Sequence, residues 1–410
     1  MRTRRKSPPA SAGGPALAAP RPWFAAGALA AAAVLVFAAA CSGGGGKAGP
    51  TPVASIGTTE GSLRLLTLPG YVEDGSADPR VDWVDSFQKR TGCHVSYSQV
   101  TTSSQLVSKF ESGSGNNFDG VLAPGDVGGT LIADHNVAPL NTQLLTGYTT
   151  IDRHLRTLPG VASGSKVYGV PFVWTPYTLG YNSSSVTATP GGWGAIFSPA
   201  SASQHAGRIS LPDTPFTIAQ VALYLRSAEP ALQITNPYEL TAKQLNAVMA
   251  VLQSVHSSDT SFWSADPDVV SQFATGGAVL GSVLPRTVSA LARAGHPIAS
   301  TSPAQGTTGA VDSWMMSTNP PDPNCMYEWL SWSTTEFVQR LVAAWLGVAP
   351  VNPAACDALG SRFCGVYHAN DPSYLDNVAF EQLPAANCGN GKADCTTWAD
   401  WQNAWNKFRS

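Results

Sequence analysis

The sequence has few charged residues and lacks the short motifs that identify common hydrolases. Asp, Glu, Lys and Arg make up only 12% of its 410 residues. Neither G-x-S-x-G nor H-E-x-x-H occurs, no glycine-rich phosphate loop is present, and the seven histidines are scattered along the chain. A hydrolase therefore stays an alternative that no motif supports, and we expect no enzymatic activity.

The sequence also lacks the features of a metal site and of a nucleic-acid-binding surface. Its seven cysteines show no C-x₂-C spacing, so we expect neither a bound metal nor another cofactor. Charge is mildly negative, with 24 basic and 27 acidic residues. Five of the basic residues and none of the acidic ones precede residue 41, which leaves the remainder at −8. This balance argues against nucleic acid as a partner.

The first forty residues are typical of a secretory signal peptide. The basic stretch MRTRRKS is followed by the uncharged run PWFAAGALAAAAVLVFAAA at 22–40 and then by Cys41. A cysteine directly after small residues resembles a bacterial lipobox, in which the thiol receives a diacylglycerol. The alternative is an uncleaved membrane anchor, because 19 apolar residues are just enough to span a bilayer. We expect a signal peptide at 1–40, lipidation at Cys41, and a location outside the cytoplasm on the outer face of the membrane. The export route, general secretory or twin-arginine, stays open.

Residues 41–60 are rich in Gly, Ser, Thr and Pro and show no periodicity, which indicates a flexible tether. Six cysteines follow it, an even number that favours disulfides in an exported chain. The short spacings make Cys356 with Cys364 and Cys388 with Cys395 the simplest pairs. Cys93 would then pair with Cys325, although six cysteines allow fifteen pairings.

Apolar periodicity predicts two α/β units in series. Short apolar runs alternate with helical patterns from residue 62 to 140 and again from 207 to 295. The segment YGVPFVWTPYTLGYN at 168–182 lies between them and contains two strand-like runs around a proline-bearing break. We interpret it as a crossover strand pair at a hinge.

Several stretches, in order, resemble the spermidine/putrescine-binding family of ABC importers; they are LLTLPGYV (65–72), FQKRTGCHVSYS (87–98), FDGVLAP (118–124), YGVPFVWTPYTLGYN (168–182), GRISLPD (207–213), LGSVLPRTVSALARAG (280–295) and AVDSWMMSTNPP (310–321). The resemblance implies a two-lobed periplasmic-binding-protein-like fold of type II. Each lobe would hold a mixed, mostly parallel sheet flanked by helices, and hinge strands would cross between the lobes. Expected boundaries are 61–174 with 310–348 for lobe I, and 175–309 with 349–410 for lobe II. A monomer serving an ABC permease follows from the same resemblance.

Four candidate ligand-binding residues fall just after predicted strands or turns, where the carboxyl ends of parallel strands face a cleft; they are Tyr71, Asp126, Asp213 and Asp312. The resemblance places Tyr71 with a cleft aromatic and Asp312 with a ligand-binding acid. It aligns Asp213 and Thr214 with a pair of acids, of which only the first is acidic here. Three of these residues have a structural alternative. Tyr71 could pack on its own turn, and Asp213 or Asp312 could cap local backbone.

The sequence departs from the polyamine binders where they carry aromatic residues. Leu68, Leu284 and Ala310 replace tryptophans, and Thr217 replaces a glutamate. Trp174 and Trp314 could partly replace the missing ring surface or belong to the core. Arg286 would suit an anionic or zwitterionic ligand. We therefore expect a transport protein for a small polar solute, with an amine weakly favoured; a secreted lipid-anchored hydrolase and a surface adhesion lipoprotein are the alternatives.

Overall fold

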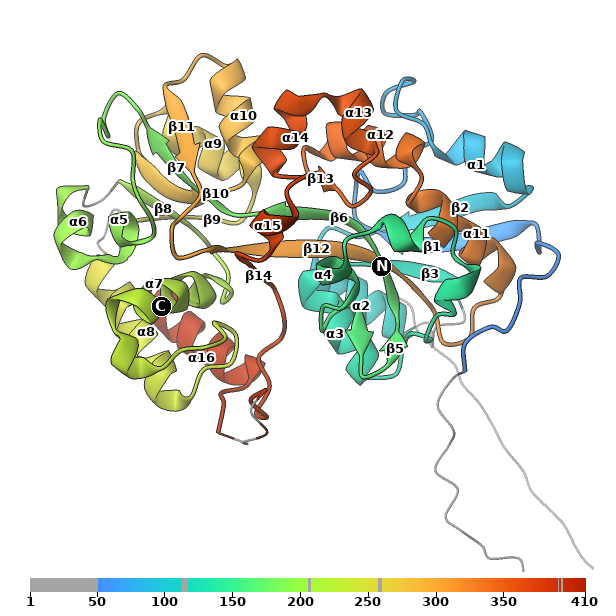
Figure 1. The fold of residues 1–410 in the computed structure, drawn as a ribbon, viewed down its shortest axis with the longest axis horizontal. Helices are drawn as coiled ribbons and strands as arrows, with labels where there is room; N and C mark the ends of the chain where they lie inside the picture. Colours follow the sequence, from blue (N-terminus) through green and yellow to red (C-terminus); the bar gives the residue numbers. More distant parts are fainter. Residues whose placement is uncertain (1–50, 113–116, 206–207, 257–259, 390, 392–393) are drawn as a thin grey trace, which may run out of the picture. The chain divides into compact units, whose positions relative to one another are not determined.

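Two mixed β-sheets organise the protein in this computed structural model (Figure 1), which describes residues 51–112, 117–205, 208–256, 260–389, 391 and 394–410. The first sheet has the strand order β13-β6-β12-β3-β1-β2, with β14 beside β12. Its strands are β1 (Ser62–Thr67), β2 (His94–Gln99), β3 (Gly120–Ala123), β6 (Gly169–Pro176), β12 (Thr307–Met316), β13 (Ala349–Pro350) and β14 (Val378–Phe380). The expected signal peptide, Cys41 and the start of the expected tether lie outside the described residues.

The second sheet has the strand order β11-β7-β10-β8-β9. Its strands are β7 (Thr178–Asn182), β8 (Ile209–Pro212), β9 (Ser261–Trp263), β10 (Leu280–Val283) and β11 (Ile298–Thr301). A small hairpin of β4 (Ala162–Ser163) and β5 (Lys166–Val167) stands apart. Each sheet combines a parallel set, β2-β1-β3 or β9-β8-β10, with antiparallel strands supplied by the crossing segments. Antiparallel pairing is thus more prominent than the mostly parallel sheets expected.

Helices cover both sheets. Those between β1 and β7 are α1 (Val84–Thr91), α2 (Ser103–Ser112), α3 (Gly125–Ala133) and α4 (Arg153–Arg156), with 3-10 turns η1 (Thr142–Leu144) and η2 (Tyr148–Thr150). Those between β7 and β11 are α5 (Gly194–Phe197), α6 (Pro199–Gln204), α7 (Thr217–Ala228), α8 (Ala242–Val255), α9 (Asp266–Ala274) and α10 (Pro285–Arg293), with η3 (Pro230–Leu232). The C-terminal part adds α11 (Pro323–Ser333), α12 (Glu336–Leu346), α13 (Ala355–Leu359), α14 (Ser361–Tyr367), α15 (Pro372–Leu375) and α16 (Trp398–Arg409).

Local sequence accounts for where these helices begin and end. Gly92 ends α1 in the left-handed conformation, at φ 74°, which glycine adopts without steric cost. Thr241 and Gln244 form a capping box that starts α8. Along α8, the apolar stripe at helical spacing buries Leu245 and Leu252 against the second sheet's core. None of the described helices combines the length and the apolar character that crossing a bilayer would require.

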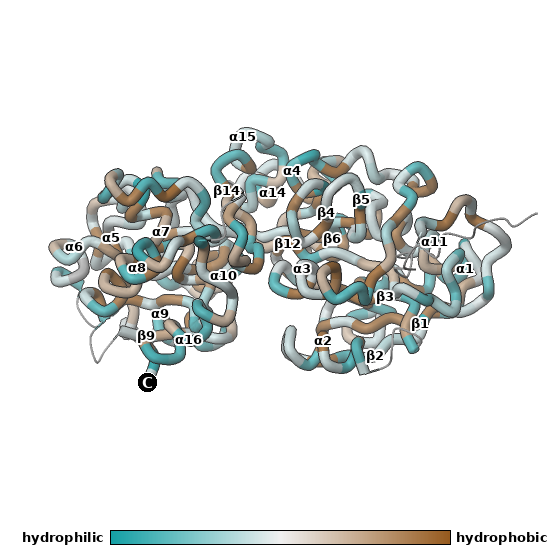
Figure 2. Tube along the Cα trace, turned by 90° about the horizontal axis from the view of Figure 1, so that it is seen from below, coloured by the Kyte–Doolittle hydropathy of each residue, from teal (hydrophilic) through white to brown (hydrophobic). Residues whose placement is uncertain are grey.

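The two sheets have separate hydrophobic cores within one compact unit, Gly49–Ser410. Figure 2 shows apolar segments inside both groups of elements. Tyr367 and Tyr374 belong to the first core, whereas Trp401 and Trp405 of α16 belong to the second. The expected assignment of 349–410 to lobe II needs correction, because β13 pairs with β6 and β14 pairs with β12. Residues up to about β14 therefore pack with lobe I, and α16 packs with lobe II.

Three disulfides join Cys93 to Cys325, Cys356 to Cys364, and Cys388 to Cys395. These are the pairs that the spacing favoured. The described end of the tether also has fixed contacts. The backbone amide of Gly57 donates to Asn324 at 2.7 Å, and the Glu60 carboxylate accepts from the backbone amide of Cys325 at 2.9 Å. The tether thus reaches lobe I several residues before β1.

Candidate functional site

Two of the connections that cross between the lobes define the site. β6 passes into β7 through Tyr177, and β11 passes into β12 through residues 302–306. The two connections are bonded to each other: the backbone amide of Tyr177 donates to the carbonyl of Thr308, and the Thr307 hydroxyl donates to the carbonyl of Tyr177, each at 2.8 Å. The proline-bearing break in the segment 168–182 is therefore the point where the chain changes sheets.

Tyr71 reaches this region from the end of β1. The turn before it requires glycine at position 70, where φ is +89° and a Cβ atom would lie 2.6 Å from Leu346 Cδ2. The Tyr71 ring lies 6.3 Å from that of Phe172. Its hydroxyl donates a short hydrogen bond to the carboxylate of Asp312. Burial, and then the neighbouring Asp312 charge, raise the pKa of Tyr71 well above its usual value, so it acts as a neutral donor.

Asp312 lies on β12, at a local irregularity of the strand. Pairing with β6 shifts register between Asp312 and Ser313, and such bulges redirect side chains. Ser313 is buried, whereas Asp312 is partly exposed beside Tyr71. Burial raises the pKa of Asp312 to about 6, while the hydrogen bond from Tyr71 and the charge of Arg286 act in the opposite direction. Asp312 thus titrates close to neutral pH.

Two more carboxylates lie within electrostatic reach of Asp312. Asp126 stands in the first turn of α3 and accepts a hydrogen bond from the Ser103 hydroxyl at 3.0 Å. Glu381 follows β14, and its carboxylate approaches the start of α3 so closely that a Cβ on Gly125 would lie 3.3 Å from it. Burial, and then the charges of Asp126 and Asp312, raise the pKa of Glu381 well above its usual value. Burial likewise raises the pKa of Asp126.

The positive charge of Arg286 is already paired. Arg286 is the second residue of α10, and its Nε makes a short ion pair with the carboxylate of Asp266 at the start of α9. The Thr287 hydroxyl donates to the same carboxylate at 3.4 Å. Arg286 therefore acts on Asp312 of lobe I, with its charge largely compensated by Asp266 of lobe II.

Tyr177 connects the two groups. Its ring lies 6.3 Å from that of Trp263, and burial, then the charge of Glu381, raise its pKa. Arg286, Asp266 and Asp126 also influence this pKa. We call the whole set the interlobe cluster: Tyr71, Asp126, Tyr177, Asp266, Arg286, Asp312 and Glu381. Its members are all partly exposed.

Sequence reasoning found four of these seven residues, namely Tyr71, Asp126, Arg286 and Asp312. It missed Asp266, although that residue comes three positions after a strand and opens a helix in the same way as Arg286. It also missed Tyr177, which stands in the proline-bearing break, and Glu381, whose region matched the family only loosely. The position of Glu381 depends on β14 pairing with β12, and no local pattern encodes that pairing.

The two candidate tryptophans belong to the core instead. Trp314 is fully buried and packs edge-on against Trp329, with ring centroids 5.6 Å apart. Trp174 is also buried, and it packs against Phe380 at 5.9 Å. Neither ring is available to a ligand, so they do not replace the aromatic residues missing at 68, 284 and 310.

Asp213 and Thr214 follow β8 at the carboxyl edge of the second sheet, and α16 and the start of α7 engage them. The Asp213 carboxylate accepts from Trp405 Nε1 at 3.2 Å and pairs with Arg409 at 3.1 Å, both on α16. The Thr214 hydroxyl accepts from the backbone amide of Phe216 at 3.3 Å, before α7. The structure therefore does not bring these two residues into the interlobe cluster.

The carboxylates of the cluster are too widely spaced to hold one metal ion. Among the described residues, the three potential ligands close enough to share an ion are Cys388, Asp394 and Cys395. Both thiols of that group are consumed by a disulfide, so it offers no thiolate. Separated carboxylates, flanked by the phenol rings of Tyr71 and Tyr177, fit an extended ligand better than a bare ion.

Comparisons with known proteins agree with this architecture. The sequence model of the bacterial extracellular solute-binding proteins matches residues 82–361. The spermidine/putrescine ABC transporter substrate-binding protein PotD from Streptococcus pneumoniae superposes with a TM-score of 0.67 at 14% identity, covering 85% of this chain and 99% of that chain. The structure of the Atu4243–GABA receptor gives 0.63 at 17% identity, with 85% and 98% covered.

A third structure, the periplasmic binding protein MotA from A. tumefaciens B6 in complex with glucopine, gives a TM-score of 0.62 at 15% identity, with 85% of this chain and 100% of that chain covered. At such identities the likeness establishes the fold, which is that of the type II periplasmic binding proteins. The match over 82–361 establishes the family: the chain belongs to the bacterial extracellular solute-binding proteins.

Proposed function

We propose that the protein is the solute-binding component of an ABC importer and that its interlobe cluster captures a small cationic amine. One observation carries this proposal. Three carboxylates of lobe I, those of Asp126, Asp312 and Glu381, meet at the lobe boundary, and the nearby Arg286 is already paired with Asp266. The carboxylates on the lobe I side of the cluster are therefore available to bind a positively charged group.

The raised pKa values support the same reading. Carboxylates that are buried near one another without a counterion hold their protons more tightly. An ammonium group placed beside them would supply the missing counterion and donate charge-assisted hydrogen bonds to the carboxylates within its reach. The raised pKa values of Asp312 and Glu381 therefore support a site for a cation.

Two phenol rings supply the apolar part of such a site. Tyr71 and Tyr177 flank the acids, and aromatic faces attract both methylene groups and cations. The interlobe cluster has fewer aromatic residues than the ligand site that the resemblance implies for the polyamine binders. This difference favours a shorter amine over a long polyamine.

The remaining features describe how the protein would be placed in the cell. A lipid on Cys41 would hold it on the outer face of the membrane, and residues 42–60 would let it reach a permease. A monomer with one interlobe site is sufficient for this role, and binding proceeds without turnover.

Replacing Cys41 with Ala should release the protein from membranes; retention at the wild-type level would indicate that residues 22–40 form an anchor.

Calorimetric titration tests the choice of ligand. Putrescine and spermidine are compared with GABA, which carries both charges, and with glutarate, which is an anion of similar length. We expect the amines to bind, glutarate not to bind, and the recovered amine to be chemically intact by mass spectrometry. Binding of glutarate without either amine would contradict the assignment of the carboxylates, and conversion of the amine would indicate an enzyme.

A further inference from the structure

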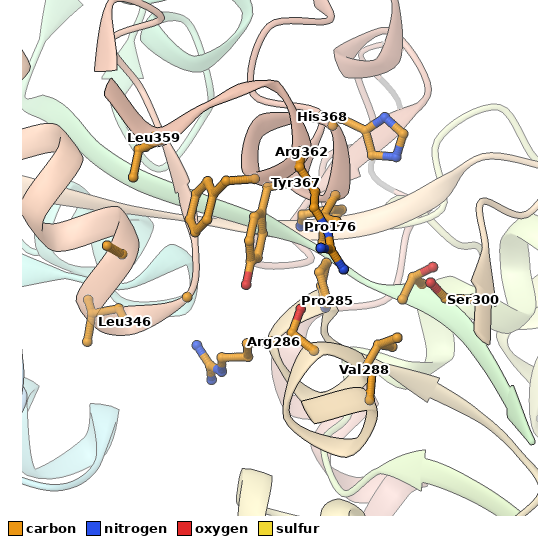
Figure 3. Close-up of a pocket in the computed structure, with 18 of the residues that line it drawn as sticks. Pro176, Pro285, Arg286, Val288, Ser300, Leu346, Leu359, Arg362, Tyr367 and His368 are labelled. Atoms are coloured by element: carbon orange, nitrogen blue, oxygen red, sulfur yellow. The ribbon is translucent and has the colours of Figure 1, made fainter. Parts of the chain in front are cut away.

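A hollow lies beside the interlobe cluster, and the charge of its lining residues has the opposite sign. This cavity of about 1000 Å³ is lined by α10 and β11 of lobe II and by α12–α14 of lobe I (Figure 3). Its floor is the crossing segment around Pro176 and Thr178. Of the interlobe cluster, only Arg286 reaches its wall. Tyr71, Asp312 and Glu381 are not among the lining residues.

The lining is basic. Arg286, Arg293, Arg362 and His368 contribute to it, and none of the lining residues within the described chain is an aspartate or a glutamate. Arg293 and Arg362 are exposed, and neither has a carboxylate within ion-pair distance among the described residues. Figure 3 shows the Arg362 side chain extending from α14 into the space above Pro285. Two free guanidinium groups on opposite walls thus face a common volume.

Aromatic and hydroxyl groups complete the pocket. The ring of His368 stacks flat on that of Tyr374, with centroids 3.7 Å apart. Phe363 and Tyr367 line the same wall, their ring centroids 4.6 Å apart. Ser300 offers a hydroxyl from the opposite side (Figure 3). This combination suits a ligand with an acidic group and an apolar or aromatic body.

The walls belong to different lobes and already touch. The Tyr367 hydroxyl is hydrogen-bonded to Ser289 of α10. Gly347 has a φ of +65°, and a Cβ there would lie 2.9 Å from the Cβ of Arg286. The wall formed by α13 and α14 is also tied by the Cys356–Cys364 disulfide. A ligand held by Arg293 on one side and Arg362 on the other would therefore bridge the two lobes.

We propose that this hinge pocket is a second binding site, distinct from the interlobe cluster, that takes an organic anion bearing a carboxylate or phosphate group. A planar guanidinium binds such groups through two parallel hydrogen bonds, and one such group on each wall gives the site its specificity for negative charge. Because the anion contacts both lobes, its binding stabilises the arrangement in which they are close together. The proposal does not depend on the nature of the cargo in the interlobe cluster.

Calorimetry and thermal melting of the full chain, purified from membranes in a neutral detergent, test the pocket. Phenyl phosphate and benzoate represent the two acidic groups, and phenol is the uncharged control with the same ring. We expect at least one anion to bind and to raise the melting temperature, and phenol to do neither. Which anion binds more tightly identifies the acidic group. Absence of binding by both anions overturns the proposal.

Arginine variants locate the binding. Arg362→Gln and Arg293→Gln should each lower the affinity for the anion by about tenfold or more. Both side chains are exposed and unpaired, so the variants should melt at the wild-type temperature without ligand. Arg90→Gln, an exposed change on α1, is the matched control and should leave binding unchanged. Equal affinity in all three variants would place the anion elsewhere and overturn the proposal.

A competition experiment separates the two sites. With phenyl phosphate bound, putrescine is added at a concentration that saturates the interlobe cluster. Phenyl phosphate that stays bound supports two sites, whereas its displacement would make the pocket the mouth of the interlobe cluster and overturn the proposal. Should the wild type bind the anion but no amine, the proposed cargo fails and the hinge pocket stands.

Discussion

Tyr71 donates its phenolic hydrogen to the carboxylate of Asp312, a residue 241 positions later in the chain. The bond connects the end of the first parallel strand, β1, to the long crossing strand β12. The pKa of Asp312 is raised to about 6, chiefly by burial. The hydrogen bond from Tyr71 has the opposite effect and lowers this pKa. The phenol is thus placed to keep one acid of the interlobe cluster ionised near neutral pH.

Replacing Tyr71 with Phe should make amine binding more sensitive to pH. Loss of the donor raises the pKa of Asp312, so the carboxylate becomes protonated at a higher pH than in the wild type. Because a protonated acid attracts a cation weakly, affinity should fall by about tenfold at pH 6 and by less at pH 8. Calorimetric titration with putrescine between pH 5 and pH 8 measures the change.

Tyr97→Phe is the control for this experiment, since Tyr97 lies on β2 and bonds only weakly to Asp74, at 3.4 Å. It should leave the pH profile unchanged. A Tyr71→Phe variant with uniformly lower affinity at every pH would show that the ring orients the ligand and does not set the ionisation of Asp312.

Amine binding should release protons at neutral pH. Burial and neighbouring acids raise the pKa of Glu381 well above its usual value, and burial raises that of Asp312 to about 6, so both carry protons in part of the unliganded population. A bound ammonium group favours the ionised forms. We expect a fraction of a proton to leave per ligand, and a larger fraction at pH 6, close to the pKa of Asp312, than at pH 8. Titrations in two buffers of different ionisation enthalpy give this number directly.

Glu381→Gln should reduce the release, because the amide cannot titrate. Glu336→Gln, which breaks an exposed pair with Arg340 on α12, should leave it unchanged. Uptake of protons on binding would mean that the ligand reaches the cluster through an anionic group, contrary to the proposed cargo.

Much of the fold could be predicted from local sequence. Alternating apolar runs marked the strands, Gly92 marked the end of α1, and cysteine spacing favoured two of the three disulfides directly. Tyr71 and Asp126 followed from their place after a strand or turn, because the carboxyl ends of parallel strands face the cleft in this class of fold. Asp312 was expected at such a place too, but it lies within β12. Arg286 came from its place near the expected cleft. Each of these features depends on residues that are close together in the sequence, so a local pattern could predict it.

The errors arose where pairing over long distances decides the outcome. The lobe assignment of residues 349–380 depends on β13 and β14 joining the first sheet, and both strands are too short to show a pattern. Glu381 was missed for the same reason. Trp174 and Trp314 were placed near a ligand because their strands cross the hinge, but their side chains point to the core face. Asp213 was expected in the site, but its carboxylate is paired with Arg409 of α16, 196 positions away.

Removing the long-range disulfide should cost more stability than removing a local one. Cys93 and Cys325 close a loop of 232 residues, whereas Cys356 and Cys364 are 8 positions apart. The chain-entropy relation gives about 5 kcal/mol for the first and about 2.5 kcal/mol for the second. Denaturant unfolding of the Cys93→Ser/Cys325→Ser and Cys356→Ser/Cys364→Ser variants measures both. A larger loss for the local pair would mean that it prevents strain in α13 and α14 beyond closing a loop.

Asp312 and Asp213 provide a matched pair of substitutions, since both follow or lie on strands and both were candidates from the sequence. Asp312 faces the interlobe cluster. A charge-assisted hydrogen bond to an ammonium group contributes about 1.5–3 kcal/mol, so Asp312→Ala should weaken amine binding by about ten- to a hundredfold. Asp312→Asn should be milder, because it keeps an acceptor for Tyr71 and the ligand while losing the charge.

Asp213→Asn should show the converse behaviour. Its carboxylate holds Arg409 and Trp405 of α16, so the substitution weakens the docking of that helix and leaves the amine untouched. An exposed ion pair is worth about 0–1 kcal/mol, and the added indole bond places the expected loss of stability near the upper end. Melting curves and putrescine titrations on the three variants give a two-by-two result: affinity changes at Asp312 with little change in melting temperature, and the reverse at Asp213. If Asp213→Asn lowered affinity as much as Asp312→Asn, the ligand would extend along the carboxyl edge of the second sheet to the end of β8, and α16 would be part of the binding site.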